Sequence, residues 1–290
     1  MQDFVDVINM HDLKIKNYHL GVIYVYIQAN NFLEKSMKNF VFTCTIIICF
    51  CLTSSSCLFS ADQEGISKKE YLYMDALALE AGTDKSSAFH NYTEVYSQFF
   101  SPFKNTPIKF LEIGIYKGDS VKLWEQYFPN AELHFIDISD KMIRYYSSRA
   151  HYHFLSQSDP KALARFGKMV GGDFDLIIDD GGHTMSQQII SFKNLFPLLK
   201  SGGLYIIEDL HTSYWTTYGG NGDQLNPKAG QGTAVEFLKN LVEDLNYVGA
   251  VTSCADFDKA PQNLIQGLNY YQSYIYSIQF FSSVCIIKKR

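Results

Sequence analysis

The sequence lacks the signals of several large classes of protein. Its 25 Lys and Arg residues are scattered and the formal net charge is −5, so a nucleic-acid partner is not expected. No group of Cys and His residues has the spacing of a zinc motif, and only Cys254 and Cys285 lie outside one N-terminal apolar stretch, which argues against structural zinc. A solenoid repeat is absent, and so is the G-x-G-x-x-G motif of nicotinamide-binding oxidoreductases.

The chain is long and apolar enough for one large domain with an extension. It has 290 residues, of which 47% are hydrophobic. We expect residues 1–61 to form the extension and residues 62–290 to form the domain. This length and composition exclude a wholly disordered chain.

The extension contains an apolar segment. Residues 40–59 carry no charge, Met37 and Lys38 precede them, and small residues follow, which predicts a secretory signal peptide starting at Met37. An uncleaved membrane anchor and a buried helix or strand are the alternatives. On the first interpretation residues 1–36 need not belong to the natural product. The localisation therefore stays open between the cytoplasm, a membrane and export.

Strands and helices alternate in the rest of the chain, which indicates an α/β domain with a mostly parallel sheet. Two final strands, at 274–281 and 283–287, predict an antiparallel hairpin at the sheet edge. The other predicted strands cover 108–113, 132–136, 174–178 and 204–207, with a short apolar piece at 151–155. The predicted helices cover 121–128, the stretch from Asp137 to Arg149, a segment starting at Asp159-Pro160, 186–199 and 233–245.

The first strand leads into a turn with two glycines. Gly114 and Gly118 follow Glu112, and glycines in this turn let a ligand approach the backbone at the carboxyl end of the sheet. Asp137 ends the next strand, where an acid can accept hydrogen bonds from ribose hydroxyls. The combination predicts a cofactor that contains a nucleoside. A packing glycine and a solvated Asp remain the structural alternative.

Two later strands end in acids. Asp179 and Asp180 close one strand, and Glu208 and Asp209 close the next. If these strands are neighbours, the four carboxylates gather at one edge and repel one another unless a cation neutralises them. Oxygen ligands of this kind suit Mg²⁺ or Mn²⁺. His183 follows on a glycine turn and is the candidate general base, with His211 as a less well placed second candidate.

Taken together, these segments resemble class I S-adenosylmethionine-dependent methyltransferases, and more narrowly the metal-dependent sugar O-methyltransferases of the macrocin and mycinamicin type. The matching blocks occur in one order: Gly82 to Lys85 with His90 to Tyr92, Phe110 to Gly118, Gln157 to Asp159, Phe174 to His183, and Glu208 to Trp215. The resemblance implies a Rossmann-like fold with a seven-stranded sheet and helices on both faces.

The resemblance also implies roles for single residues. Asp180, Glu208 and Asp209 would hold Mg²⁺ (or Mn²⁺), and His183 would be the catalytic base. Glu112 and Gly114 would line the methionine end of the cofactor, Asp137 its ribose, and Gln157 with Asp179 its adenine side. The implied cofactor-binding residues are Thr83, Tyr92, Glu112, Gly114, Gly118, Asp137, Gln157 and Asp179.

The implied reaction is O-methylation of a sugar or vicinal diol. The metal would bind two adjacent oxygens and lower the hydroxyl's pKa, so that the alkoxide attacks the sulfonium methyl. The implied partner is a glycosylated or diol-bearing small molecule, with homo-oligomers and membrane association through residues 40–59 as further expectations. Ser156 stands where relatives often carry an acid, and the large N-terminal domain of the macrolide enzymes has no counterpart in this sequence. Another small-molecule methyltransferase, a cephalosporin-hydroxylase-like relative and a non-catalytic cofactor-binding module are the alternatives.

Overall fold

The computed structural model describes residues 14–16, 24–26, 67–221 and 227–290. The chain divides into two compact units, Met1–Gly65 and Ile66–Arg290. In the first unit, β1 (Lys14–Lys16) pairs with β2 (Tyr24–Tyr26) in antiparallel fashion. The apolar segment predicted as a signal peptide or anchor lies outside the described residues. No helix within the described part of the chain combines the length and hydropathy needed to cross a bilayer.

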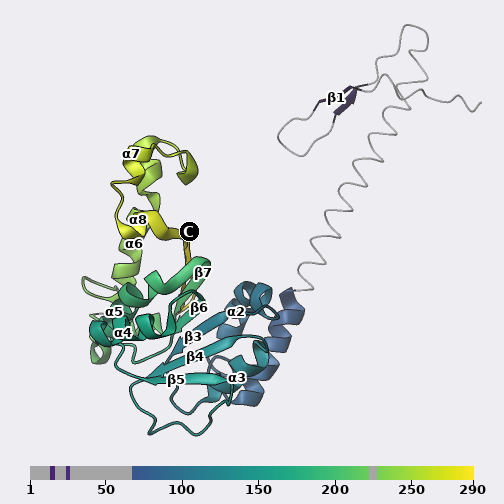
Figure 1. The fold of residues 1–290 in the computed structure, drawn as a ribbon, viewed down its shortest axis with the longest axis vertical. Helices are drawn as coiled ribbons and strands as arrows, with labels where there is room; N and C mark the ends of the chain where they lie inside the picture. Colours follow the sequence, from purple (N-terminus) through teal and green to yellow (C-terminus); the bar gives the residue numbers. More distant parts are fainter. Residues whose placement is uncertain (1–13, 17–23, 27–66, 222–226) are drawn as a thin grey trace, which may run out of the picture. The chain divides into compact units, whose positions relative to one another are not determined.

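The second unit is built on a seven-stranded sheet with the strand order β5-β4-β3-β6-β7-β9-β8 (Figure 1). The strands from β5 to β7 are parallel, and β9 is antiparallel to both β7 and β8. This confirms the predicted α/β sheet with an antiparallel hairpin at its edge. The strands are β3 (Lys109–Ile113), β4 (Glu132–Asp137), β5 (Ala150–Phe154), β6 (Phe174–Asp179), β7 (Leu199–Ile207), β8 (Ile275–Phe280) and β9 (Cys285–Lys289).

Helices cover both faces of the sheet, because successive strand residues point to opposite sides. On β3, Phe110 packs in a core with α2, α3 and the helical segment 67–81, whereas Leu111 packs in a core with α4, α5 and α6. Figure 1 shows α2 and α3 on one side of the strands and α4 and α5 on the other. The helices are α2 (Tyr92–Phe100), α3 (Asp119–Tyr127), α4 (Pro160–Val170), α5 (Met185–Leu195), α6 (Ala234–Thr252), α7 (Gln262–Ile265) and α8 (Tyr270–Tyr274).

The start of α4 shows how the local sequence sets a boundary. The Asp159 side chain accepts a hydrogen bond from the backbone N–H of Lys161 at 2.9 Å, and Pro160 occupies the first helical position. Proline is favoured there because its missing N–H has no partner inside the helix. At the other end Gly171 adopts a left-handed conformation with φ of 81°. The predicted start at Asp159-Pro160 is confirmed.

The helix predicted between Asp137 and Arg149 is wrong, because residues 138–149 contain no helix. The segment has no apolar stripe to bury: Ile138 and Met142 are exposed instead and line a cavity. Its backbone is held by tertiary contacts, since the N–H groups of Arg144 and Tyr145 both donate to the carbonyl oxygen of Lys117. These contacts take the place of an intrahelical ladder.

Three other boundaries differ from the prediction. The helix predicted at 186–199 ends at Leu195 and continues as the 3-10 turn Phe196–Leu198. Strand β7 begins at Leu199 and runs through the two glycines that were expected to precede it. The pairing of β6 with β7 shifts register between Phe174 and Leu176, which absorbs this irregular beginning. The last long helix, α6, extends to Thr252 instead of ending near residue 245.

Candidate active site

A cavity of about 470 Å³ opens at the carboxyl ends of β3, β4 and β6. From β3 the chain proceeds to β4 and β5 on one side and later returns to β6 and β7 on the other. Open α/β sheets bind ligands at such a switch point, and the volume lies in the range of small-molecule sites. The cavity is lined by six of the predicted site residues, Gly114, Asp137, Gln157, Asp180, His183 and Asp209. Thr83 and Gly114 line a second cavity, of about 260 Å³.

The glycine turn after β3 fits closely against the end of β6. Gly114 has φ of 98°, and a Cβ atom at this position would overlap the carbonyl oxygen of Asp180. The Asp137 carboxylate stabilises the turn, because it accepts hydrogen bonds from the N–H groups of Ile115 at 2.8 Å and Tyr116 at 3.1 Å. Gly118, with φ of 89°, precedes the first residue of α3. The turn is therefore rigid and lies directly against the candidate metal ligand Asp180.

Gln157 connects the loop after β5 to the end of β6. Its amide nitrogen donates to Asp179 Oδ1 at 3.0 Å and to Ser191 Oγ at 2.8 Å, and its Oε1 atom accepts from the Gly182 N–H at 2.8 Å. A Cβ atom on Gly181 would overlap Gln157 Oε1. Gln157 borders the cavity, whereas Asp179 is buried, and burial raises the pKa of Asp179 to about 7. In this structure both residues support the turn that carries His183.

The turn reverses at His183 and not at its glycines. His183 has φ of 57°, a left-handed conformation that a residue with a Cβ atom adopts at a cost of about 1–2 kcal/mol. Asp209, after β7, has φ of 54°. Two candidate active-site residues therefore share a conformation that is uncommon outside glycine, and such conformations are concentrated at functional sites.

The carboxylates after β6 and β7 meet as predicted, because β6 and β7 are neighbours in the sheet. The Nε2 atom of His183 lies 3.5 Å from Asp209 Oδ2 and 4.0 Å from Asp180 Oδ1. Ligand atoms of these three residues lie within 4.8 Å of one another, and all three side chains are partly exposed to the cavity. This first group joins a base to two acids.

A second group of acids is buried around Lys85. The Lys85 Nζ atom contacts Asp180 Oδ2, lies 2.8 Å from Glu208 Oε2, and is 3.6 Å from Glu112 Oε1. Burial alone would lower the pKa of Lys85, but its three carboxylate neighbours outweigh burial and raise the pKa well above its ordinary value. Lys85 is thus a permanent cation inside the acid cluster.

The same burial acts on the acids. It raises the pKa of Glu208, and it raises the pKa of Glu112 to about 7 although Lys85 opposes the shift. Glu112 Oε2 accepts a hydrogen bond from Ser120 Oγ at 2.7 Å, while its Oε1 atom has no hydrogen-bond partner among the described residues. Asp180 belongs to both groups and connects the buried acids to the cavity.

Two tyrosines on α2 hold the acids in place. The Tyr92 hydroxyl donates to Asp209 Oδ1 at 2.7 Å, and the Tyr96 hydroxyl donates to Glu208 Oε1. Their spacing of four residues places both hydroxyls on one face of the helix. In this structure Tyr92, predicted to bind the cofactor, contacts a candidate metal ligand. His211 donates to or accepts from Ser283 Oγ through Nδ1 and lies 4.0 Å from Asp209 Oδ1, at the edge of the site.

Sequence reasoning missed Lys85 and Tyr96 as parts of the site. Lys85 stood within a matching block, but nothing in its neighbourhood separates a buried lysine from a solvated one. The available signal was the excess of acids at two strand ends, which requires a cation. Tyr96 stands in an aromatic-rich stretch of the sequence, where a core position is the simplest interpretation, and its ring does stack on Phe100 while its hydroxyl reaches Glu208.

Comparisons with known proteins agree with this geometry. A family profile described as a methyltransferase domain matches residues 111–210. The 8-demethyl-8-alpha-L-rhamnosyl tetracenomycin-C 2'-O-methyltransferase of Streptomyces olivaceus is 38% identical over 178 residues, covering 59% of this chain and 45% of that protein. The L-olivosyl-oleandolide 3-O-methyltransferase of Streptomyces antibioticus is 35% identical over 207 residues, covering 69% and 52%.

A solved structure of a methyltransferase is similar to this chain in its fold. The MycE methyltransferase of the mycinamycin biosynthetic pathway, in complex with Mg, SAH and mycinamycin VI, matches with a TM-score of 0.62 and 29% identity. The match covers 74% of this chain and 53% of that protein. The chain spans about half the length of the curated relatives that it matches. From its sheet, its profile match and these likenesses, the chain contains a methyltransferase domain with a Rossmann-like class I fold, and it is similar to the macrocin and mycinamicin sugar O-methyltransferases.

Proposed function

We propose that this protein transfers the methyl group of S-adenosylmethionine to a hydroxyl of a sugar or vicinal diol on a small molecule, with the assistance of a divalent metal ion. The observation that carries the proposal is the convergence of His183, Asp180 and Asp209 on one cavity beside the Gly114 turn. A base, two metal-type ligands and a cofactor-type turn then serve a single site. The relatives named as sugar O-methyltransferases and the Mg and SAH in the MycE complex support the same assignment.

The cofactor would occupy the cavity along the ends of β3 and β4. Gly114 leaves the space for close approach, and Asp137 retains acceptor capacity beyond its backbone partners, since a carboxylate offers about four lone-pair sites. Gln157 would border the cofactor, with Asp179 orienting Gln157 from behind. Thr83 and Gly118 belong to the neighbouring turns. When bound, S-adenosylmethionine supplies an electrophilic methyl group.

The acid clusters fit a divalent ion. Glu112, Asp180 and Glu208 share the single ammonium group of Lys85, and Asp209 lies beside His183, so the site holds more carboxyl groups than Lys85 can neutralise. Asp180 Oδ1 and Asp209 Oδ2 are turned toward His183 and the cavity, and oxygen donors of this type suit Mg²⁺ or Mn²⁺. Glu208 would complete the set, although its oxygens are engaged by Lys85 and Tyr96. When bound, the ion supplies Lewis acidity that lowers the pKa of a coordinated hydroxyl.

His183 would accept the proton of the acceptor hydroxyl at Nε2. Asp209 and Asp180 flank this nitrogen and would stabilise the imidazolium that forms. Tyr92 would hold Asp209 in position, while Thr212 Oγ1 donates to the carbonyl oxygen of His183 at 3.0 Å and fixes its backbone. Positioned general bases of this kind contribute about 10²–10⁴-fold to rate.

The proposal is tested with the full chain and S-adenosylmethionine labelled in its methyl group. Calorimetry first compares S-adenosylmethionine with NAD, and a panel of glycosylated acceptors is then screened for label transfer with Mg²⁺ and with a chelator. We expect binding of S-adenosylmethionine and metal-dependent labelling of at least one acceptor. Absence of S-adenosylmethionine binding, both with Mg²⁺ and with the chelator, would refute the proposal. Cofactor binding without transfer to any acceptor class would favour a non-catalytic module.

The role of His183 needs a matched comparison. His183→Ala should lower turnover by about 10²–10⁴-fold while leaving the affinity for S-adenosylmethionine nearly unchanged. His151→Ala removes an exposed imidazole on β5 that does not line the cavity, and it should retain normal turnover. Normal turnover in the His183 variant would remove it from the mechanism.

A further inference from the structure

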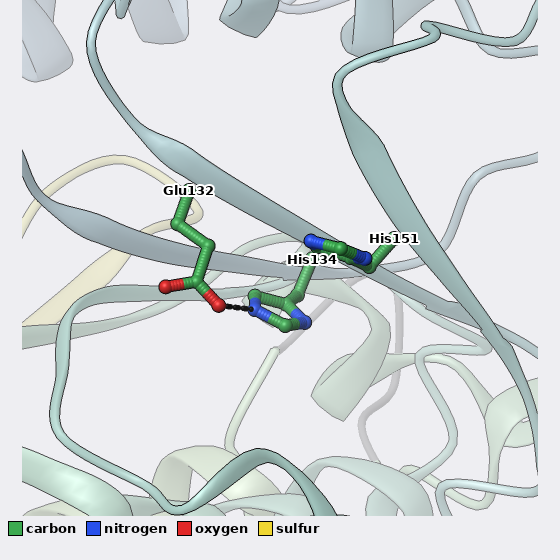
Figure 2. Close-up of side chains that lie close together, drawn as sticks. All are labelled: Glu132, His134 and His151. Carbon is green, nitrogen blue, oxygen red and sulfur yellow. Dashed lines mark hydrogen bonds and ion pairs between the residues drawn. The ribbon is translucent and has the colours of Figure 1, made fainter.

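One face of the parallel pair β4 and β5 carries a cluster of imidazoles away from the active site. Glu132 and His134 lie two residues apart on β4, and His151 and His153 lie two residues apart on β5. Because alternate residues of a strand share a face, and because His134 pairs in register with His151, all four side chains gather on the face covered by α4. Figure 2 shows Glu132, His134 and His151 side by side.

His134 is the centre of this cluster. Its Nε2 atom lies 2.7 Å from Glu132 Oε1, and its Nδ1 atom lies 3.0 Å from His153 Nε2. Its ring stacks on His151 with centroids 4.9 Å apart and on His153 with centroids 5.3 Å apart. His134 is buried, whereas Glu132 and His151 are exposed.

We propose that Glu132, His134 and His151 form a site for a divalent transition-metal ion, zinc in the first instance. One potential ligand atom from each residue lies within 4.8 Å of the others. Two imidazoles and one carboxylate are typical ligands of zinc, with water in the remaining position. Mg²⁺, which prefers oxygen ligands, would not be bound in this place.

One of the three ligands is buried and the other two are exposed, an arrangement that suits ion capture. Ligand atoms around a tetrahedral zinc ion are about 3.3 Å apart, as follows from bond lengths near 2.0 Å. The buried ring of His134 is the fixed point, and the side chain of Glu132 is 52% exposed and free to adjust. Among the described residues no side-chain hydrogen bond restrains the exposed His151. The ligand atoms, which lie within 4.8 Å of one another, would have to approach to this spacing by movement of Glu132 and His151.

His153 supplies the support that a metal-binding histidine needs. A ligating imidazole usually donates its second N–H to a neighbouring acceptor, which fixes its orientation. The Nδ1 atom of His134 already faces His153 Nε2. This contact orients the His134 ring so that its Nε2 atom faces Glu132.

One group competes with the ion. The Lys109 Nζ atom lies 3.9 Å from Glu132 Oε1 and offers that carboxylate an alternative cation. The cluster is also separate from the catalytic cavity, because Glu132 begins β4 and lies about 16 Å along the strand from Asp137 at its other end. A bound ion would join the edge strand β5 to β4, and we expect it to stabilise the sheet edge rather than to act on substrate.

The test uses the full chain without an affinity tag and with Asp180→Asn and Asp209→Asn, which remove the two acids of the active site that border the cavity. Zinc is titrated by calorimetry, and Co²⁺ spectra report the coordination. Relative to this background, Glu132→Gln and His151→Asn should each weaken one equivalent of bound zinc at least tenfold. His153→Phe, which removes only the support, should weaken it about 10–100-fold.

Lys109→Met should change the affinity for zinc in the opposite direction from the three substitutions above. It should strengthen zinc binding because Glu132 loses its competing ammonium group, a result that general misfolding cannot produce. Circular dichroism without zinc checks the fold of each variant. Zinc affinity that is unchanged in both Glu132→Gln and His151→Asn would overturn the proposal, and so would Co²⁺ spectra that are the same in these variants and in the background protein.

Discussion

Replacement of Lys85 by Met tests whether the buried acids depend on a lysine counterion. The side chains of Lys85 and Glu112 are fully buried, and Glu208 is almost fully buried. The variant keeps the apolar part of the side chain and removes only the ammonium group. Asp180, Glu208 and Glu112 then lose the cation that lies within 3.6 Å of each.

The expected loss of stability is large. Removing one partner of a buried ion pair costs about 3–5 kcal/mol, because the remaining charge stays desolvated. For a domain of this size that corresponds to a fall in the unfolding midpoint of about 10 °C. The remaining acids would take up protons, so the loss should be smaller at pH 5 than at pH 8. Added Mg²⁺ should restore part of the stability if the acids accept a divalent ion.

The assay is chemical denaturation of the full chain, followed by tryptophan fluorescence at both pH values in the presence of a chelator and then of Mg²⁺. The double variant Lys85→Met/Glu208→Gln is the matched control. It removes one charge of each sign, and it should recover at least half of the lost stability because replacing both partners of a buried pair is close to neutral. A single variant as stable as the wild type, or a double variant less stable than the single one, would refute the counterion role.

Three further predictions concern neighbouring positions. The stability advantage of Asp179→Asn over the wild type should grow by about 2–3 kcal/mol between pH 5 and pH 8. The folded Asp179 has a pKa of about 7, so the stability of the wild type falls as the pH rises from the ordinary Asp pKa toward 7. Denaturation at each pH checks this, and a difference that does not change with pH would contradict it. Gly114→Ala should weaken S-adenosylmethionine binding more than tenfold in calorimetry, since its Cβ atom would overlap the Asp180 carbonyl group. Tyr92→Phe should lower turnover about fivefold, with little change in cofactor affinity, because Asp209 loses a donor worth about 1 kcal/mol. Unchanged kinetics would separate Tyr92 from the mechanism.

The sequence predicted the sheet well because its signals are local. The largely apolar strands β3, β4, β6 and β7 each lead into an acid or a glycine at the same edge of the sheet, whereas β5, with His151 and His153, has no such ending. The convergence of Asp180 and Asp209 followed from the pairing of β6 with β7. The helix predicted between Asp137 and Arg149 is wrong because its apolar residues Ile138 and Met142 line a cavity and its backbone bonds to Lys117, and neither tertiary contact can be predicted from the local sequence.

The partners of the acids could not be predicted in the same way. Lys85 lies 95 residues before Asp180 and 123 residues before Glu208, and no periodicity connects positions so far apart. The histidine cluster also joins residues from separate parts of the sequence. Its members on β4 and β5 are brought together by parallel strand pairing, so the spacing along the chain resembles no metal motif.

The position of Lys85 in the chain has a consequence for engineering. Residues 111–210, the region shared with the methyltransferase profile, contain Asp180, Glu208 and His183 but neither Lys85 nor the two α2 tyrosines. A chimera that grafts this region onto another scaffold would import Glu112, Asp180 and Glu208 without their ammonium counterion, and Glu208 and Asp209 without the hydroxyl groups that orient them. A workable graft must therefore also include residues 82–96, although they precede the first strand of the sheet.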